Sequence, residues 1–121
     1  MATRNATVTE TKFFLDHFGN AIQWSGLLNG DQGDNWEIPG ALERSIQVTG
    51  TFGAGGTIVL EGSNDGTNFV TLLDPQGVAV SFTAAGLKSQ GNFARYVRPR
   101  VTAGDGTTTL VATLVVRRWK R

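Results

Sequence analysis

Hydrophobic and polar residues alternate in short runs along residues 21–118, and glycine-rich reversals separate the runs. An alternation with a period of two places successive side chains on opposite faces of a β-strand, so that one face can be buried. Ile22 and Trp24 share one face of such a strand, and Ile46 and Val48 share one face of the next. Further strands are predicted at residues 57–62, 68–73, 78–82, 93–102 and 108–116. No convincing amphipathic helix interrupts them, so we predict an all-β fold in which two antiparallel sheets pack as a β-sandwich.

The strand predicted at residues 108–116 is apolar on both faces. Leu110 and Leu114 lie on one face, and Val111 and Val115 lie on the other. A strand that is apolar on both sides is normally covered on both sides. The second cover is either a crossing loop or another copy of the chain, and we predict self-association through Val111 and Val115.

The first twenty residues differ from the rest of the chain. Threonines alternate with mixed neighbours, and an aromatic cluster of Phe13, Phe14 and Phe18 follows them. Residues 1–20 are interpreted either as an extended N-terminal arm that docks on the domain or on another subunit, or as a first strand of the sandwich. The remaining residues, 21–121, are predicted to form one β-sandwich domain.

Glycine and proline predict two local features in the second half of the chain. Residues 84–92 contain Gly86 and Gly91 and are interpreted as a connecting loop. Pro99 has no N–H group to donate to a neighbouring strand. The strand that contains Pro99 is therefore predicted to lie at a sheet edge or to be bulged at this residue.

Composition excludes several classes of protein. The chain has 121 residues, of which 40% are hydrophobic, 16 are glycine and none is cysteine. It can bury a small core, but it has no disulfide framework and no thiolate site. The first residues lack the apolar run of a signal peptide, and no stretch approaches the length of a membrane helix. We expect a single domain with no association with membranes.

Charge is nearly balanced, with a net charge of +1, but it is unevenly placed. Four basic residues lie among the last five, namely Arg117, Arg118, Lys120 and Arg121. This basic end either contacts an acidic protein surface or protects the last strand from pairing wrongly. We do not expect nucleic acid as a partner, because the overall charge gives no general attraction to phosphates.

Catalytic and metal-binding chemistry find little support in the sequence. His17 is the one histidine, and no nucleophile-elbow motif accompanies it, so we predict that the chain is not an enzyme. Asp31 and Asp34 lie on a glycine-bearing loop and carry the oxygen donors that calcium prefers, but aspartate is also a default residue of surface turns. We expect no metal and no cofactor. Trp36 and Trp119 lie beside a loop and a terminus, and we predict that they contact something outside the domain.

Four blocks of sequence carry a resemblance to a known group of proteins. They are residues 24–31 (WSGLLNGD), 45–52 (SIQVTGTF), 61–69 (EGSNDGTNF) and 98–102 (RPRVT). Over about residues 20–118 the chain resembles small β structural proteins of tailed bacteriophages, and in particular capsid decoration or cement proteins. The resemblance implies a protein that is made in the host cytoplasm, binds the major capsid protein on the outer surface of the head, and clamps neighbouring capsid subunits. It also implies a homo-oligomer, with a trimer favoured.

The function predicted from the sequence is therefore capsid decoration in a phage virion, without catalysis. The predicted partner contacts are Phe13, Phe14, Phe18, Trp36, Arg117, Arg118, Trp119, Lys120 and Arg121. One alternative is a component of the phage tail or neck. Another is a carbohydrate-binding β-sandwich module that recognises a host surface with Trp36 and Trp119 as its platform.

Overall fold

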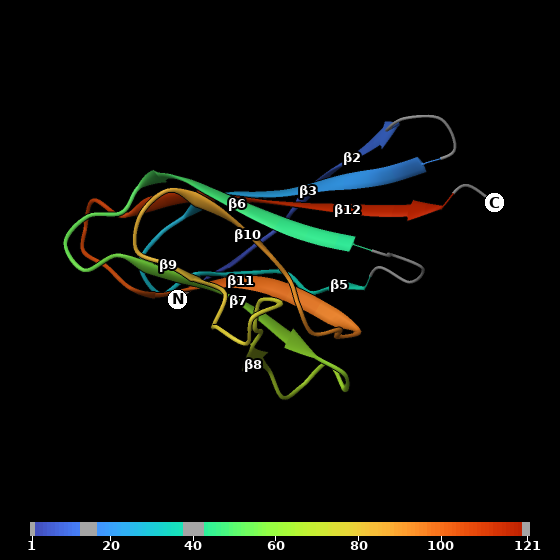
Figure 1. The fold of residues 1–121 in the computed structure, drawn as a ribbon. Coiled ribbons are helices and arrows are strands. Elements are labelled where there is room, and N and C mark those ends of the chain that lie inside the picture. The colour runs from blue at the N-terminus through green and yellow to red at the C-terminus, as the bar shows by residue number, and fades with distance from the viewer. Residues whose placement is uncertain (1, 13–16, 38–42, 120–121) are drawn as a thin grey trace.

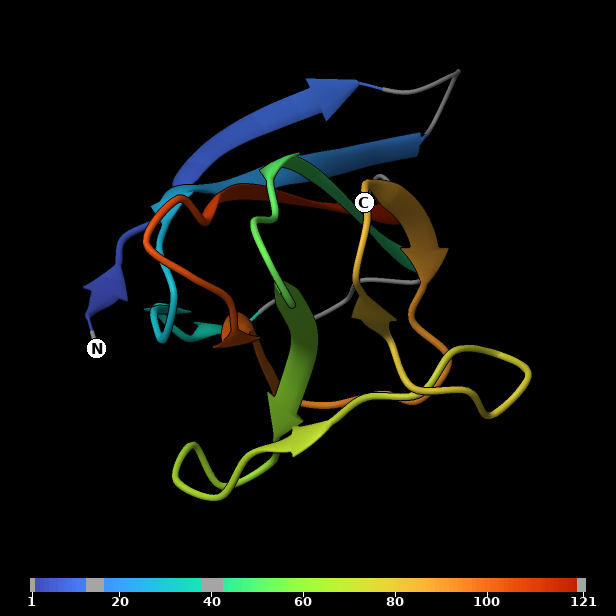
Figure 2. The ribbon, with the colours of Figure 1, turned by 90° about the vertical axis from the view of Figure 1, so that its left-hand side faces the viewer.

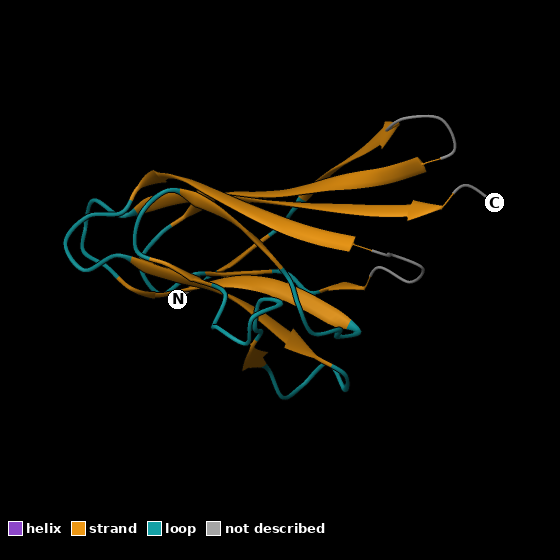
Figure 3. Cartoon of the chain, viewed as in Figure 1, coloured by secondary structure: helices purple, strands orange, loops and turns teal. Residues whose placement is uncertain are grey.

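A computed structural model describes residues 2–12, 17–37 and 43–119, and these residues form strands and loops without any helix (Figure 3). The strands are β1 (Thr3–Arg4), β2 (Thr7–Lys12), β3 (His17–Leu27), β4 (Gln32–Gly33), β5 (Trp36–Glu37), β6 (Glu43–Thr51), β7 (Thr57–Ser63), β8 (Val70–Thr71), β9 (Ser81–Phe82), β10 (Gly86–Ser89), β11 (Tyr96–Ala103) and β12 (Thr109–Trp119). In the part of the chain that the structure describes, no helix could span a membrane.

The strands form two sheets that face each other (Figures 1 and 2). One is a five-stranded sheet in the order β10-β6-β12-β3-β2. The other is a seven-stranded sheet with the path β1-β4-β11-β7-β8, in which β5 also pairs with β11 and β9 also pairs with β7. Every strand pair is antiparallel except β1 with β4. The predicted all-β sandwich is confirmed.

The core lies between the sheets and is made by the predicted alternation. Along β12, Leu110, Ala112, Leu114 and Val116 are fully buried, and Trp24 of β3 faces them from the neighbouring strand with no exposed surface. Burial of this kind stabilises a fold by about 25 cal/mol for each Å² of apolar surface removed from water. The most strongly alternating strands thus carry the centre of the core.

The N-terminal residues belong to both sheets. Strand β1 pairs in parallel with β4 in the seven-stranded sheet, whereas β2 pairs with β3 at the edge of the five-stranded sheet. The chain therefore crosses from one layer to the other near Ala6, which packs against the core. Residues 3–12 thus contribute one strand to each sheet of the sandwich.

Pro99 does not lie at a sheet edge, so this prediction is wrong. Strand β11 is flanked along its length by β7, with Pro99 opposite Leu60, and on its other side by β4 and β5. These two short strands meet β11 only at residues 96–97 and at Arg100, so a missing N–H group breaks no ladder there. The register shift lies further along, between Val101 and Ala103.

The region before β11 also departs from the prediction. Residues 84–92 were expected to form a loop, but β10 within them pairs with β6 over four residue pairs and forms an edge of the five-stranded sheet. Val78 was placed with Val80 and Phe82 in one alternating strand. It is instead 56% exposed, because the regular strand β9 begins only at Ser81.

Candidate functional site

The outer side of the five-stranded sheet presents, up to the row before Arg117, a surface without ionisable side chains. Residues that alternate with the buried positions of β3, β6 and β12 must point away from the core. Cross-strand register extends this surface onto β2 and β10, because paired residues share a face. We call it the uncharged face, and it comprises Thr7, Thr9, Ala21, Gln23, Ser25, Ser45, Gln47, Thr49, Leu87, Val111, Thr113 and Val115.

The register aligns neutral side chains in rows across the uncharged face. Thr113 lies between Gln47 on β6 and Gln23 on β3, and Thr7 of β2 follows Gln23. Gln23 Nε2 donates a hydrogen bond to Thr113 Oγ1 at 3.1 Å. Cross-strand contacts of this kind hold the side chains in a defined arrangement. Depletion of charge is the compositional mark of the central part of a protein–protein interface.

The two residues predicted for self-association lie at the centre of this surface. Val111 and Val115 are half-buried on β12, the middle strand of the five-stranded sheet. Val115 pairs with Ser45 on one side and with Ala21 on the other. Both neighbours have small side chains, and Val115 keeps part of its surface exposed.

The opposite layer carries charge on its outer side. Glu61 of β7 is buried and accepts hydrogen bonds from Arg98 Nε at 3.0 Å and from Arg100 Nη1 at 3.2 Å. The Arg98 guanidinium also lies 3.7 Å from the centre of the Phe69 ring. The outer sides of the two sheets therefore differ in chemistry at these positions.

The aromatic and basic segments of the two termini approach each other at one end of the five-stranded sheet. The backbone of Phe18 lies between Lys12 of β2 and Arg118 of β12, and Trp119 pairs with His17. In Figure 1, β2, β3 and β12 extend beyond the other strands at this end. Arg117 continues the outward-facing column of β12 toward it and is half-buried. Phe13, Phe14, Lys120 and Arg121, also predicted as partner contacts, lie outside the described residues.

Trp36 lies in the other sheet and is not an exposed platform. It pairs with Val97 in β11, is half-buried, and packs against the core. Its Nε1 donates to Asp34 Oδ1 at 3.1 Å, and the same oxygen accepts a hydrogen bond from Trp24 Nε1 at 2.7 Å. The backbones of Trp36 and Trp119 belong to different sheets of the sandwich.

Asp31 and Asp34 fasten the N-terminal residues to the domain. Asp31 is 4% exposed and accepts hydrogen bonds from Ala2 N at 3.0 Å, Leu28 N at 3.0 Å and Arg4 Nε at 2.8 Å. Asp34 Oδ1 also accepts one from Ala6 N at 3.2 Å. The two carboxylates thus have structural partners, and the described residues contain no group of three or more His, Cys, Asp or Glu that could hold a metal ion.

Comparison with known proteins gives a likeness in fold alone. No family model matches the chain, and no curated protein sequence matches it significantly. The crystal structure of YomS, an SPBc2 prophage-derived protein, superposes with a TM-score of 0.61 and 10% identity, covering 82% of this chain and 94% of YomS. The fold is shared with a prophage-derived protein. A cupin domain from Bordetella pertussis Tohama I has a TM-score of 0.48 and 11% identity over 98% of both chains, and this likeness is too low to carry an argument.

Hydrogen bonds within two turns stabilise the charged form of the aspartates that lie there. Hydrogen bonds from the backbone N–H groups of Asn68 and Thr67 lower the pKa of Asp65 well below its ordinary value. The Thr107 hydroxyl and the Ala54 N–H group lower the pKa of Asp105 to about 2. Each is the carboxylate of a predicted reversal, so the turn explains the residue.

Asp31 behaves similarly for a different reason. Burial alone raises the pKa of Asp31, but hydrogen bonds from Leu28, Arg4 and Ala2 outweigh it and leave the pKa below the ordinary value. The charged form is thus the one that the folded protein favours.

We predict that these carboxylates make the fold sensitive to acid. A carboxyl group whose folded-state pKa is depressed contributes stability above its unfolded pKa of about 3.9, and this contribution is lost as the pH falls toward the folded value. The free energy of unfolding should be nearly constant between about pH 7 and pH 5 and decrease below about pH 4. Urea unfolding across this range measures it. The double variant Asp65→Asn, Asp105→Asn keeps one acceptor oxygen at each residue and removes both titrating carboxyl groups, so its decrease should be shallower. An unchanged decrease would contradict the assignment.

Proposed function

We propose that this chain is a structural protein of a tailed-phage virion that decorates the outer surface of the capsid and acts without catalysis. The observation that carries the proposal is the uncharged face, a neutral surface spread over a rigid sheet. A protein of this kind works by contact with other proteins. The fold shared with prophage-derived YomS and the sequence resemblance to phage structural proteins supply the phage setting.

The chain offers two surfaces for the two contacts that decoration requires. The uncharged face serves self-association into a homo-oligomer, with a trimer favoured. The end of the five-stranded sheet at Phe18, Arg118 and Trp119 serves the major capsid protein, since the aromatic and basic segments converge there. Basic side chains would speed the encounter with an acidic surface and make it sensitive to salt.

Quantitative mass spectrometry of purified virions, combined with antibody labelling in electron microscopy, tests the proposal. Decoration predicts a copy number comparable to that of the major capsid protein and label distributed over the head. Label confined to the tail or neck, at low copy number, would instead support the alternative virion location. Absence of the chain from purified virions would contradict both.

A further inference from the structure

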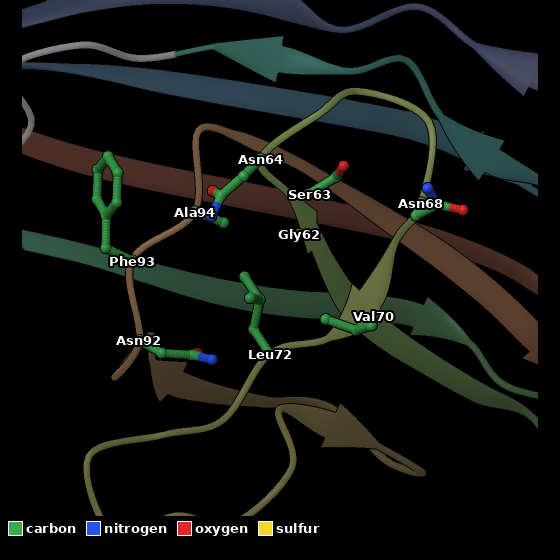
Figure 4. A pocket seen from close by; sticks show the side chains of 9 residues that line it. All are labelled: Gly62, Ser63, Asn64, Asn68, Val70, Leu72, Asn92, Phe93 and Ala94. Atoms are coloured by element: carbon green, nitrogen blue, oxygen red, sulfur yellow. The ribbon is translucent and has the colours of Figure 1, made fainter.

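A recess lies on the seven-stranded layer, away from the uncharged face. It has a volume of about 220 Å³ and is lined by residues 62–64, by residues in the segment 68–72 that includes β8, and by residues 92–94 before β11 (Figure 4). The sequence separates these segments by up to about thirty residues, and strand pairing between β7, β8 and β11 brings them together. None of its lining side chains is ionisable.

Two asparagines present amide donors whose orientation is fixed. Asn64 Oδ1 accepts a hydrogen bond from Arg95 N at 3.0 Å, and Asn92 Oδ1 accepts one from Leu73 N at 2.9 Å. A backbone N–H group can bond only to the carbonyl end of the amide, so the NH₂ ends are the free ends. No described protein group accepts a hydrogen bond from either NH₂ group, and each retains two donors for a ligand.

Asn68 adds a hydrogen-bond acceptor to the recess. Its Nδ2 donates to Asp65 Oδ2 at 2.9 Å, which leaves the side-chain carbonyl without a described donor. The Asp65 carboxylate accepts this hydrogen bond and others from the backbone N–H groups of Thr67 and Asn68. Its oxygens therefore stabilise the turn and are not available to a ligand. The recess therefore combines fixed donors and an acceptor, all of them neutral.

The apolar part of the recess includes an exposed aromatic ring. Phe93 is 71% exposed and Val70 is 65% exposed, whereas Leu72 and Ala94 are buried beneath them. The Arg44 guanidinium lies 5.2 Å from the centre of the Phe93 ring and donates to Ala94 O at 3.1 Å. A cation held against the ring keeps Phe93 in place at the margin of the recess. In Figure 4 Leu72 lies between the levels of Asn64 and Asn92, with the Phe93 ring on the left and Val70 on the right.

We propose that this recess binds a neutral sugar ring. A pyranose has an apolar C–H surface that can pack on Phe93 and Val70, and its hydroxyl groups both donate and accept hydrogen bonds. They can therefore accept from the Asn64 and Asn92 NH₂ groups and donate to the Asn68 carbonyl. Apolar walls with a few fixed polar groups are the usual composition of a small-molecule site. An extended peptide fits less well, since β8 is only two residues long and offers little edge for strand addition.

The proposal does not rest on capsid decoration, because the recess is on the layer opposite the uncharged face. It also differs from the sugar platform considered from the sequence, since neither Trp36 nor Trp119 lines the recess. Loss of sugar binding and loss of virion association are thus separate results.

Nuclear magnetic resonance titration of the ¹⁵N-labelled full chain tests the proposal. The probes are glucose, galactose and N-acetylglucosamine, each added separately. At least one sugar should shift the side-chain NH₂ signals of Asn64 and Asn92 and the backbone signals of residues 92–94. Phe93→Ala should weaken binding about tenfold or more. Leu28→Ala is the matched control, because Leu28 is 42% exposed and belongs neither to the recess nor to the uncharged face.

A second variant separates binding from folding. Asn92→Asp keeps an oxygen to accept from Leu73 N but replaces the NH₂ donor by a second acceptor. This variant should remain folded, with an unchanged backbone spectrum away from the recess, and should lose sugar binding about tenfold or more. The proposal is overturned if none of the three sugars shifts these signals, if Phe93→Ala binds as well as the wild type, or if an extended peptide shifts them and no sugar does.

Discussion

Deletion of residues 1–6 is expected to lower the free energy of unfolding by about 3 kcal/mol or more. The deletion removes Ala2 N and Arg4 Nε from Asp31, which is 4% exposed and then keeps only the Leu28 N–H group. Removing one partner of a buried ion pair leaves a charge that water reaches poorly. Breaking a buried ion pair costs roughly 3–5 kcal/mol. We expect the low end of this range because the Arg4 side chain is itself 39% exposed.

Urea unfolding of the wild type and the truncated chain measures this effect as a shift in the midpoint. Thr3→Ala and Asn5→Ala serve as controls, because both side chains are exposed on the same segment and make none of these bonds. Both control variants should stay within about 0.5 kcal/mol of the wild type. Equal midpoints for the truncated and intact chains would show that the N-terminal residues contribute nothing to the sandwich.

Strands with several alternating residues could be predicted from the sequence, because their apolar residues all lie on the one face that is buried in the core. The alternation of Leu110, Ala112 and Leu114 survives in β12, and Trp24 is buried as expected. The two-residue strands β4 and β5 have too few residues to show a period. Their positions follow from tertiary contacts, such as the close approach of Trp24 and Pro99 to Gly33, where a Cβ atom would lie 2.6 Å from Trp24 Nε1.

The two candidate surfaces, the uncharged face and the recess, could be predicted from the sequence to different degrees. The neutral outward positions of the uncharged face, such as Gln23, Gln47 and Thr113, alternate with the core residues and could have been identified from the sequence. Only the register, which pairs Thr113 with both glutamines, shows that they form one surface. The recess could not be predicted, because Asn64 and Asn92 acquire their roles from backbone partners and a long-range strand pairing.

Replacement of Val115 by aspartate is expected to abolish self-association. Val115 lies on the uncharged face between Ser45 and Ala21, and the nearest charged residue of its own outward column is Arg117, two residues along β12. In an oligomer that covers this face the new carboxylate would be removed from water among small neutral neighbours, at a cost of several kcal/mol. A cost of about 3 kcal/mol weakens association by roughly two orders of magnitude. In the monomer the same carboxylate points to solvent, so the fold should persist.

Light scattering coupled to size-exclusion chromatography gives the mass of each species, and far-UV circular dichroism reports the fold. Val115→Asp should elute with the mass of one chain of 12.9 kDa and keep the wild-type spectrum. Val78→Asp introduces the same charge at a valine that is 56% exposed outside the uncharged face, and it should keep the wild-type mass. If the two variants lose association equally, the added charge itself is responsible and the uncharged face is not the interface. If the wild type is monomeric even at high protein concentration, this surface has no affinity for a second copy, and its lack of charge must serve contact with a different protein.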